Sequence, residues 1–411
     1  MQTDVKGNYK VDYYPVSTIT AGAPIEFSID GSSEDYIDVN DITLSLKLKV
    51  LKSDGTDITA ADKVGLNNLP ISTLFQDVAL SISDTQIEGG QQNYPYLGYF
   101  MTMLQFHPAA QDSHMQTLGW YKDESGKFDD DSNSGFVSRK KLIEGSKSFQ
   151  LIGPLFLDYM RQERYLISNT NLRIKLIPSK PEFALNAFGA ATSFKIQFEE
   201  VILQVSRAEM NPSVINGHAT GMKRQNAHYP ITHTDLITFT IPKGQKSYIK
   251  DRLFPDQSPK LIAIAMVENE AYNGSIKKNP FNFQHFDLSK IALYREGRSI
   301  PGAPLTPNFD EGMYLHSYVQ TMETMGYYNT DDTNGLTPDE FANGYTIYAY
   351  DLTGDKNISN THRQGHLSNN LRLELYFAKD LPSTVNVLIW ACFDSYIEIT
   401  QLRDVITAYT H

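Results

Sequence analysis

Three oxygen-bearing side chains in one acidic stretch have the spacing of a calcium-binding loop. Asp129, Asp131 and Asn133 stand where an EF-hand loop places its first, third and fifth ligands. That loop also needs a glycine at its sixth position and a bidentate glutamate at its twelfth. This chain has Ser134 and Lys140 at those two positions. We therefore expect a solvated loop here rather than a metal site.

A second acidic stretch and a pair of histidines fail similar tests. Asp332 and Asn334 again suggest a calcium loop, but Phe341 stands where the glutamate would be needed. His362 and His366 are four residues apart, which on a helix would place both on one face as zinc ligands. The surrounding SNTHRQGHLSNN is typical of a loop and offers no nearby acidic partner. We predict no metal and no cofactor.

The motifs of common enzymes are missing from the sequence. G-x-S-x-G and H-E-x-x-H do not occur, and Gly126-Lys127 lacks the preceding glycine of a P-loop. Paired carboxylates for glycoside hydrolysis stay open, because such residues meet only in space. Trp120 and Trp390 are the only tryptophans that could stack on a sugar. We predict no catalytic residue and no enzyme, with a sugar-binding or carbohydrate-active β-sandwich protein as the alternative.

The charge balance argues against nucleic acid as the main partner. The 411 residues include 48 acidic and 36 basic side chains, which gives a net charge of −12. Proteins that grip nucleic acid usually carry a basic face, whereas this overall field repels phosphate. We therefore predict no sequence-specific binding of nucleic acid.

Cys392 is the single cysteine, so no disulfide can form within the chain. The first residues, MQTDVKGNYK, lack the apolar core of a signal peptide. The longest apolar run, near residues 387–393, is far shorter than the ~20 residues that span a bilayer. We expect a protein without a membrane span that is made without a secretion signal.

Alternating apolar and polar residues predict many strands with one wet face. ITLSLKLKV at 42–50 alternates without interruption, which is typical of a half-buried strand. FKIQFEEVILQV at 194–205 alternates, slips by one residue at Glu199-Glu200, and then resumes. A slip of this kind predicts a β-bulge.

The chain also repeats itself about half a length apart. IEFSIDGSSEDYID at 25–38 aligns without a gap to ITFTIPKGQKSYIK at 237–250. Val78-Ala79-Leu80 matches Ile291-Ala292-Leu293, and NLRIKL at 171–176 matches NLRLEL at 370–375. A repeat of this length is a duplicated domain rather than a solenoid period.

Each half contains one stretch with helical periodicity and one long polar loop. Leu97, Phe100, Met101 and Leu104 follow the i, i+3, i+4, i+7 pattern, and Leu315, Tyr318, Val319 and Met322 repeat it. We expect two short amphipathic helices, each closing one end of a sandwich. The loops at 119–141 and 327–344 follow these helices, and we expect them to face solvent or a partner.

Many short strands, turn-rich connections and a duplication predict an all-β protein. We expect two tandem eight-stranded jelly-roll β-sandwiches, a double jelly roll, each with a short helix in a loop. Residues 1–215 form the N-terminal jelly roll, with an N-terminal arm at 1–22, and residues 216–411 form the C-terminal one. The polar stretch at 207–228 marks the boundary, and we expect the arm either to tie neighbouring subunits together or to be a disordered tail.

VNVLIWACF at 385–393 is apolar on both faces of the strand it predicts. Leu388, Trp390 and Cys392 lie on the second face, and such strands are usually covered on both sides. We predict that this second face packs against the partner jelly roll or a neighbouring subunit.

Several of these segments together resemble a known family. They are PIEFSIDGSSEDYIDVNDITLSLKLKV, NLPISTLFQDVALSISDTQIEG, YPYLGYFMTMLQF and the matched NLRIKL and NLRLEL. As a set they resemble the double jelly-roll major capsid proteins of double-stranded DNA viruses, in the lineage of adenovirus hexon. The likeness to the capsid proteins of Polinton (Maverick) elements and adintoviruses is strongest, and it spans residues 20 to 400 or so.

The resemblance implies a structural protein of the virion capsid, with no catalytic residues to carry over. Its subunits would form homotrimeric, pseudo-hexagonal capsomers that tile an icosahedral shell. A separate penton protein would fill the vertices, and minor capsid proteins would be further partners. The inter-strand loops here are far shorter than those of hexon, which argues against tall surface towers. The alternative is a non-viral sugar-binding or carbohydrate-active protein.

Overall fold

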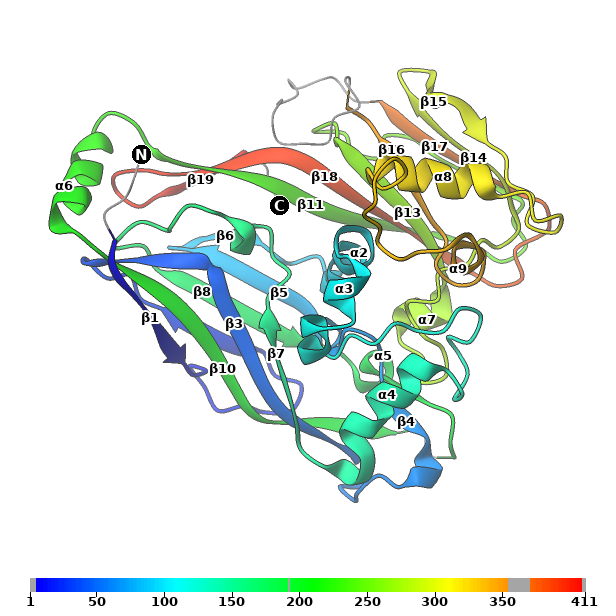
Figure 1. Ribbon diagram of the computed structural model, residues 1–411, viewed down its shortest axis with the longest axis horizontal. Helices are drawn as coiled ribbons and strands as arrows, with labels where there is room; N and C mark the ends of the chain where they lie inside the picture. The colour runs from blue at the N-terminus through cyan, green and yellow to red at the C-terminus, as the bar shows by residue number, and fades with distance from the viewer. Residues whose placement is uncertain (1–4, 191–192, 354–369, 409–411) are drawn as a thin grey trace.

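A computed structural model describes residues 5–190, 193–353 and 370–408. The first half of the chain forms a sandwich of two antiparallel four-stranded sheets (Figure 1). One sheet has the order β1 (Val5–Tyr13), β10 (Phe194–Met210), β3 (Asp35–Lys52), β7 (Phe149–Pro154). The other has the order β2 (Ile25–Ile29), β8 (Leu172–Pro178), β5 (Phe75–Ile82), β6 (Thr85–Glu88). A short ribbon pairs β4 (Val64–Leu66) with β9 (Leu185–Ala187).

The second half forms another sandwich. One sheet has the order β11 (Ala227–Ile241), β18 (Val385–Ile399), β13 (Leu261–Glu268), β16 (Ile347–Asp351), and β19 (Val405–Thr407) also pairs with β18. The facing sheet has the order β12 (Ser247–Lys250), β17 (Leu371–Phe377), β14 (Leu288–Arg295), β15 (Arg298–Leu305).

The two sandwiches share one topology. When β4, β9 and β19 are set aside, the eight main strands of each half follow the same rule. The first, eighth, third and sixth strands form one sheet, and the second, seventh, fourth and fifth form the other. This arrangement of eight antiparallel strands in two sheets is a jelly roll. The predicted double jelly roll is therefore confirmed.

Two of the three predicted repeat matches pair equivalent strands, and one does not. Val78 and Ile291 lie in β5 and β14, and the segments 171–176 and 370–375 lie along β8 and β17. The match of 25–38 with 237–250 is wrong, because 25–29 is the second strand of its jelly roll whereas 237–241 ends the first. Apolar and polar residues alternate in the same way in every half-buried strand. A match that rests on this alternation can therefore pair the first strand of one jelly roll with the second strand of the other.

Local predictions for the strands hold in detail. In β2, Ile25, Phe27 and Ile29 are buried and the residues between them are exposed. The pairing of β10 with β3 shifts register between Phe198 and Glu200, which confirms the predicted β-bulge. Residues 5–13 of the predicted N-terminal arm form β1, which pairs with β10.

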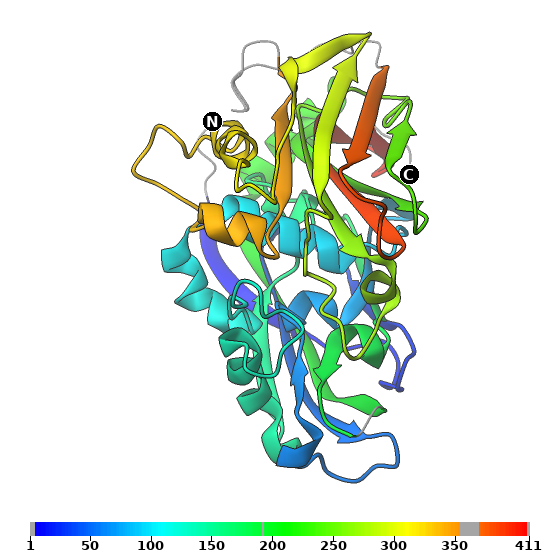
Figure 2. The same cartoon turned by 90° about the vertical axis from the view of Figure 1, so that its right-hand side faces the viewer.

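Both predicted helices exist, and each follows the fifth main strand of its jelly roll. They are α2 (Tyr94–Gln105) and α8 (Leu315–Thr324). The α2 helix lies between the two sandwiches (Figure 2), and all its residues except Leu97 and Gln105 are buried. The expectation that this helix only closes the end of one sandwich is therefore wrong. A helix covered by a jelly roll on both sides must be apolar nearly all round.

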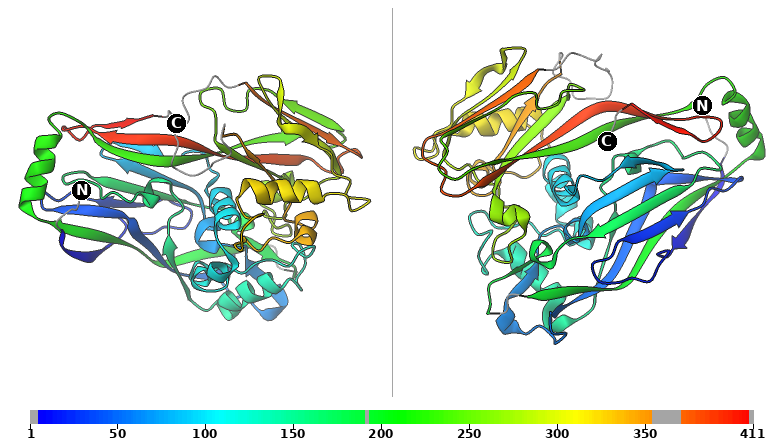
Figure 3. Two further views of the ribbon diagram at one scale, coloured as in Figure 1. Left: turned by 45° about the horizontal axis from the view of Figure 1, so that its top comes forward. Right: turned by 180° about the vertical axis from the view of Figure 1, so that it is seen from behind.

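Short helices fill most connections. They are α1 (Pro70–Thr73), α3 (Pro108–Gln111), α4 (Ser134–Ile143), α5 (Pro181–Ala184), α6 (Pro212–Gly221), α7 (Asn269–Asn273) and α9 (Pro338–Ala342), with 3-10 turns η1 (Ala60–Asp62), η2 (His114–Leu118), η3 (Glu144–Ser146) and η4 (Tyr159–Arg161). The α6 helix joins β10 to β11 at one end of the molecule (Figure 3). The predicted boundary at 215–216 falls inside α6. Within the described ranges, no helix is both long and apolar enough to cross a membrane.

A substitution at Gly344, at the end of the 327–344 loop, tests how tightly the two long loops pack. Its φ is +110°, and an added Cβ would lie 2.2 Å from the Phe128 ring of the other loop. Gly326 has a φ of +79° but open space around it. Gly326→Ala should cost only the left-handed backbone penalty of about 1–2 kcal/mol. Gly344→Ala should cost about 1–3 kcal/mol more, because Phe128 must move.

Urea unfolding of the two variants measures this difference. Equal loss of stability in Gly344→Ala and Gly326→Ala would show that the two loops do not pack as described.

Candidate functional site at the seam between the jelly rolls

The seam is defined here as the surface where α2, β6 and the segments 119–141 and 155–162 of the first jelly roll meet the second. Aromatic rings form its centre. Three side chains of α2 each stack on a ring from the second jelly roll. The pairs are Tyr96–Tyr272, Tyr99–Phe281 and Phe100–Phe283, with ring centroids 5.5, 4.1 and 5.5 Å apart. Stacked pairs of this kind add to the burial of apolar area, so the seam resembles a protein core.

The residues predicted to form a packing face lie beside this cluster. Leu388, Trp390 and Cys392 are all buried on β18, with 0%, 1% and 5% of their surface exposed. The Trp390 ring is nearly parallel to the Phe100 ring of α2, at 6.3 Å between centroids. Burial raises the pKa of the Cys392 thiol, so the sulfur stays protonated and unreactive.

A buried ion pair orders the 119–141 loop. Arg139 of α4 donates to the Asp123 carboxylate at 2.6 Å, and both side chains are essentially inaccessible to water. Arg139 also donates to the carbonyl oxygens of Leu66 and Tyr121, so the guanidinium is held on three sides. Asn133 donates to the same carboxylate and caps α4. These buried contacts hold the loop against the first jelly roll.

The same loop also binds the second jelly roll. The Asn279 side chain donates to the second oxygen of Asp123 at 3.3 Å, and the Tyr345 hydroxyl donates to the Asp123 carbonyl at 2.7 Å. Lys122 forms an ion pair with Glu340 at 2.7 Å. Asp123 thus joins the two jelly rolls as well as the ends of its own loop.

The expectation that the loops at 119–141 and 327–344 face solvent or a partner holds in both forms: Asp129, Asp130 and residues 328–333 are exposed, whereas other residues of both loops contact partners within the chain. Asn133 and Asn334 are fully buried, and Asn334 donates to the Met103 carbonyl of α2. Asp129 accepts a hydrogen bond from the backbone N–H of Asn279, and Asp131 forms an ion pair with Lys63. Residue types alone do not distinguish a polar loop that faces water from one whose partner is another loop.

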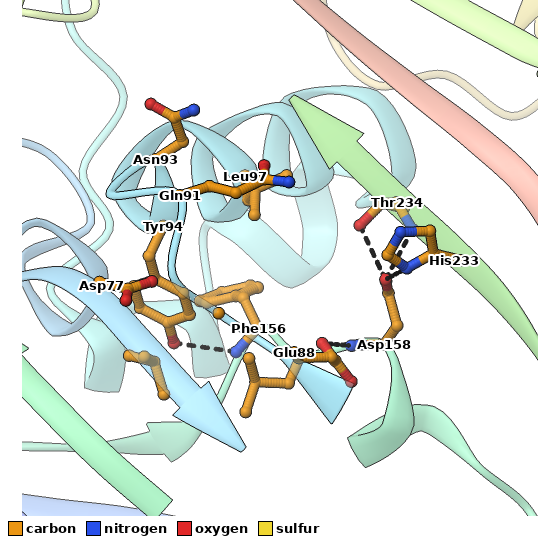
Figure 4. Close-up of a pocket in the computed structure, with 13 residues that line it drawn as sticks. Asp77, Glu88, Gln91, Asn93, Tyr94, Leu97, Phe156, Asp158, His233 and Thr234 are labelled. Atoms are coloured by element: carbon orange, nitrogen blue, oxygen red, sulfur yellow. Dashed lines mark hydrogen bonds and ion pairs between the residues drawn. The ribbon is translucent and has the colours of Figure 1, made fainter. Parts of the chain in front are cut away.

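A second polar contact crosses the seam further along (Figure 4). The Asp158 carboxylate accepts the backbone N–H of Thr234 at 2.6 Å and its hydroxyl at 2.9 Å. The Glu88 carboxylate in turn accepts the backbone N–H groups of Asp158 and Tyr159, at 2.8 and 2.7 Å. Burial, and then the negative charge of Asp158, raise the pKa of Glu88 well above its ordinary value.

These groups suit binding between jelly rolls more than chemistry. The carboxylates at the seam already accept backbone or side-chain hydrogen bonds, and the one cysteine is neutral. In the part of the chain that the structure describes, no three histidine, cysteine or acidic side chains are arranged to hold a metal ion. His362 and His366 lie outside the described residues. No signal in the sequence singled out Asp123 or Arg139, whose importance arises only from their partners.

Arg139→Met tests the buried ion pair. Losing the guanidinium leaves Asp123 charged and buried, which should destabilise the protein by about 3–5 kcal/mol. Lys127→Met is the matched control, because Lys127 pairs with Glu124 on the surface of the same loop. That variant should unfold like wild type, since exposed pairs contribute little. If both variants unfold at the wild-type urea concentration, the Asp123–Arg139 pair does not stabilise the fold.

Known proteins that resemble this chain match both of its halves. No protein-family model matches the sequence. An uncharacterised Caenorhabditis elegans protein, F54H12.2, is 25% identical over 400 residues, covering 93% of each chain.

Solved structures match the fold over its full length. The PBCV-1 virus capsid chain matches at a TM-score of 0.63 with 12% identity, covering 100% of this chain and 98% of that one. A chain from the Sputnik virophage matches at 0.65 with 12% identity, covering 99% and 89%. The mavirus major capsid protein matches at 0.57 with 10% identity, covering 98% and 90%. The chain thus has the fold of the double jelly-roll major capsid proteins of viruses.

Proposed function

We propose that this protein is a structural major capsid protein and not an enzyme. The observation that carries the proposal is the pairing of two equivalent jelly rolls across an extensive buried seam in one chain. Folds alone do not fix function, but the likeness to viral capsid chains covers both jelly rolls. In the residues described here, the seam offers binding contacts where an enzyme would need reactive groups.

Geometry explains why duplication would be useful in a shell. Identical subunits usually close around a symmetry axis. Three chains, each with two similar jelly rolls side by side, would form a homotrimer with threefold symmetry and a nearly hexagonal outline. Such capsomers can tile the faces of an icosahedral capsid. The seam would serve this function by holding the two jelly rolls of each chain at one fixed angle.

We also propose that the chain divides into jelly rolls at 1–215 and 216–411. The face of β18 that carries Leu388, Trp390 and Cys392 is then a packing face between the two. The parallel stacking of Trp390 on Phe100 of α2 supports this assignment. On this proposal the three residues act within each capsomer subunit rather than between subunits.

The proposed setting is the virion capsid of a Polinton (Maverick) or adintovirus-like element. A penton protein at the vertices and minor capsid proteins would be partners.

The native mass of the purified protein tests the proposal. One chain is 46.4 kDa, so a closed trimer should be found at about three times that mass by light scattering after gel filtration. A clean monomer at every salt concentration would contradict the capsomer proposal. It would favour the sugar-binding alternative.

Salt should strengthen association of trimers into larger lattices. Three chains of net charge −12 bring a formal charge of −36 together, and salt screens the repulsion between neighbouring trimers. Light scattering should therefore rise between roughly 50 and 500 mM sodium chloride, over which the Debye length falls severalfold. Sucrose of equal osmolarity is the control and should have no such effect. Lattices that form best at low salt would contradict this account.

A further inference from the structure

The outer edge of β11, the first strand of the second jelly roll, is closed by side chains of the first jelly roll. Backbone groups of alternate residues point to the same side of an antiparallel strand, and β18 occupies only one side of β11. On the other side, four backbone groups bind side chains from the first jelly roll. The pairs are Arg164 with His228, Gln162 with Pro230, Asp158 with Thr234, and Asn93 with Leu236.

The equivalent strand of the first jelly roll, β1, has no such cover. It pairs with β10 along one edge. Within the described ranges, no backbone group on its other edge has a hydrogen-bond partner. Lys6 and Lys10 lie on β1, but each pairs with an acidic side chain of its own jelly roll. The nine-residue edge is therefore open to another chain, and no unpaired lysine protects it.

Apolar side chains lie beside this open edge. Tyr9 of β1 is 45% exposed, and Tyr14 and Val16, directly after the strand, are 62% and 69% exposed. Exposed apolar side chains that gather in one place are typical of a surface that binds another protein. We call the outer edge of β1, together with Tyr9, Tyr14 and Val16, the acceptor surface.

The start of α8 is the counterpart of the part of α2 that covers β11. Each helix follows the fifth main strand of its jelly roll. The N-cap residues have nearly the same backbone angles, with φ −116° and ψ 8° at Asn93 and φ −126° and ψ 2° at Tyr314. The first turn of α2 is buried against the second jelly roll. Met313 and Leu315, on either side of Tyr314, are instead 59% and 56% exposed. We call these two residues the donor surface.

The opposite face of α8 is bound to its own jelly roll, which fixes the position of the donor surface. The Thr321 hydroxyl donates to the Ile347 carbonyl of β16 at 2.8 Å, and the Thr324 hydroxyl donates to the Ala349 carbonyl at 3.2 Å. The α8 helix and β1 lie at opposite ends of the molecule (Figure 1). The donor surface therefore cannot cover the acceptor surface of its own chain.

We propose that the donor surface of one chain covers the acceptor surface of a second copy, an inference that rests on the homotrimer proposed above. The contact repeats between chains what α2 and its neighbours do for β11 within one chain. It is head-to-tail, because two different surfaces meet, and such contacts close into a ring when the rotation between neighbours allows it. In a ring of three chains, a neighbouring jelly roll then covers every first strand. Burial of the apolar side chains on both surfaces favours the association.

Crosslinking of engineered cysteines tests the contact. Tyr9→Cys and Leu315→Cys are combined in one full-length chain, which is purified in its native form and treated with a flexible bismaleimide. Cys392 is buried and its thiol stays neutral, so it does not compete for the reagent. We expect covalent dimers and trimers on a denaturing gel. Each single variant should remain a single chain, because Tyr9 meets Leu315 of another copy and neither residue meets itself.

Charge substitutions measure the strength of the same contact. Tyr14→Glu and Leu315→Glu each place a charge in the interface, and each should weaken trimer association at least about thirtyfold, the effect of losing one hot-spot residue. Leu402→Glu is the matched control, because Leu402 is 83% exposed and lies on neither surface. That variant should associate like wild type. Light scattering over a range of protein concentrations gives the affinities, and circular dichroism shows whether each variant is folded.

The possible failures of this contact and of the capsomer are distinguishable. A trimer by native mass that gives no covalent product in the double variant, or that keeps its affinity in Leu315→Glu, would overturn the contact and leave the capsomer standing. Covalent dimers from Tyr9→Cys alone would show that two β1 edges pair with each other, which also contradicts the contact. A monomer at every salt concentration would contradict both proposals.

Discussion

The stacking of α2 on aromatic rings of the second jelly roll is the contact on which the rest of the structure depends. Each sandwich has its own apolar interior, but neither interior determines how the two sit relative to one another. Tyr96, Tyr99 and Phe100 do so by inserting between the sheets and meeting Tyr272, Phe281 and Phe283. Aromatic pairs contribute about 0.5–1.5 kcal/mol each beyond the area they bury. The two jelly rolls therefore behave as one body.

Polar contacts then select one orientation among those that apolar packing would allow. Apolar contacts are not directional, whereas hydrogen bonds need defined distances and angles. Asp123 accepts hydrogen bonds from Arg139 and Asn133 of the first jelly roll and from Asn279 of the second. A partly satisfied network of this kind would be costly, so the fully paired arrangement favours a single geometry. For the proposed capsid subunit, such a geometry would matter more than a reactive group.

The sequence predicts each jelly roll better than the relation between the two. Period-two alternation predicted strands such as β2 and β3, and the slip at Glu199-Glu200 predicted the bulge in β10. Alternation shows which face of a strand is exposed to water, but not which strand of the jelly roll it is. The match of 25–38 to 237–250 therefore paired strands that are not equivalent. The loss of alternation in 385–393 was the one sequence signal that a second covered face exists.

The long loops show the limit of reasoning from residue types. Asn133 and Asn334 look like turn residues exposed to water, yet each is buried because its hydrogen-bonding groups find partners in the fold. The Asn334 partner lies 231 residues away, so no local pattern indicates it. Asn133 and Arg139 bind Asp123 of the same loop, 10 and 16 residues away, but residue types alone do not show that the loop folds back on itself.

Electron microscopy of the purified protein would decide whether three chains close into a capsomer. We expect threefold-symmetric particles with a nearly hexagonal outline, in which six jelly-roll lobes surround the axis. Averaged particles without a threefold axis, or with two chains related by a twofold axis, would contradict it.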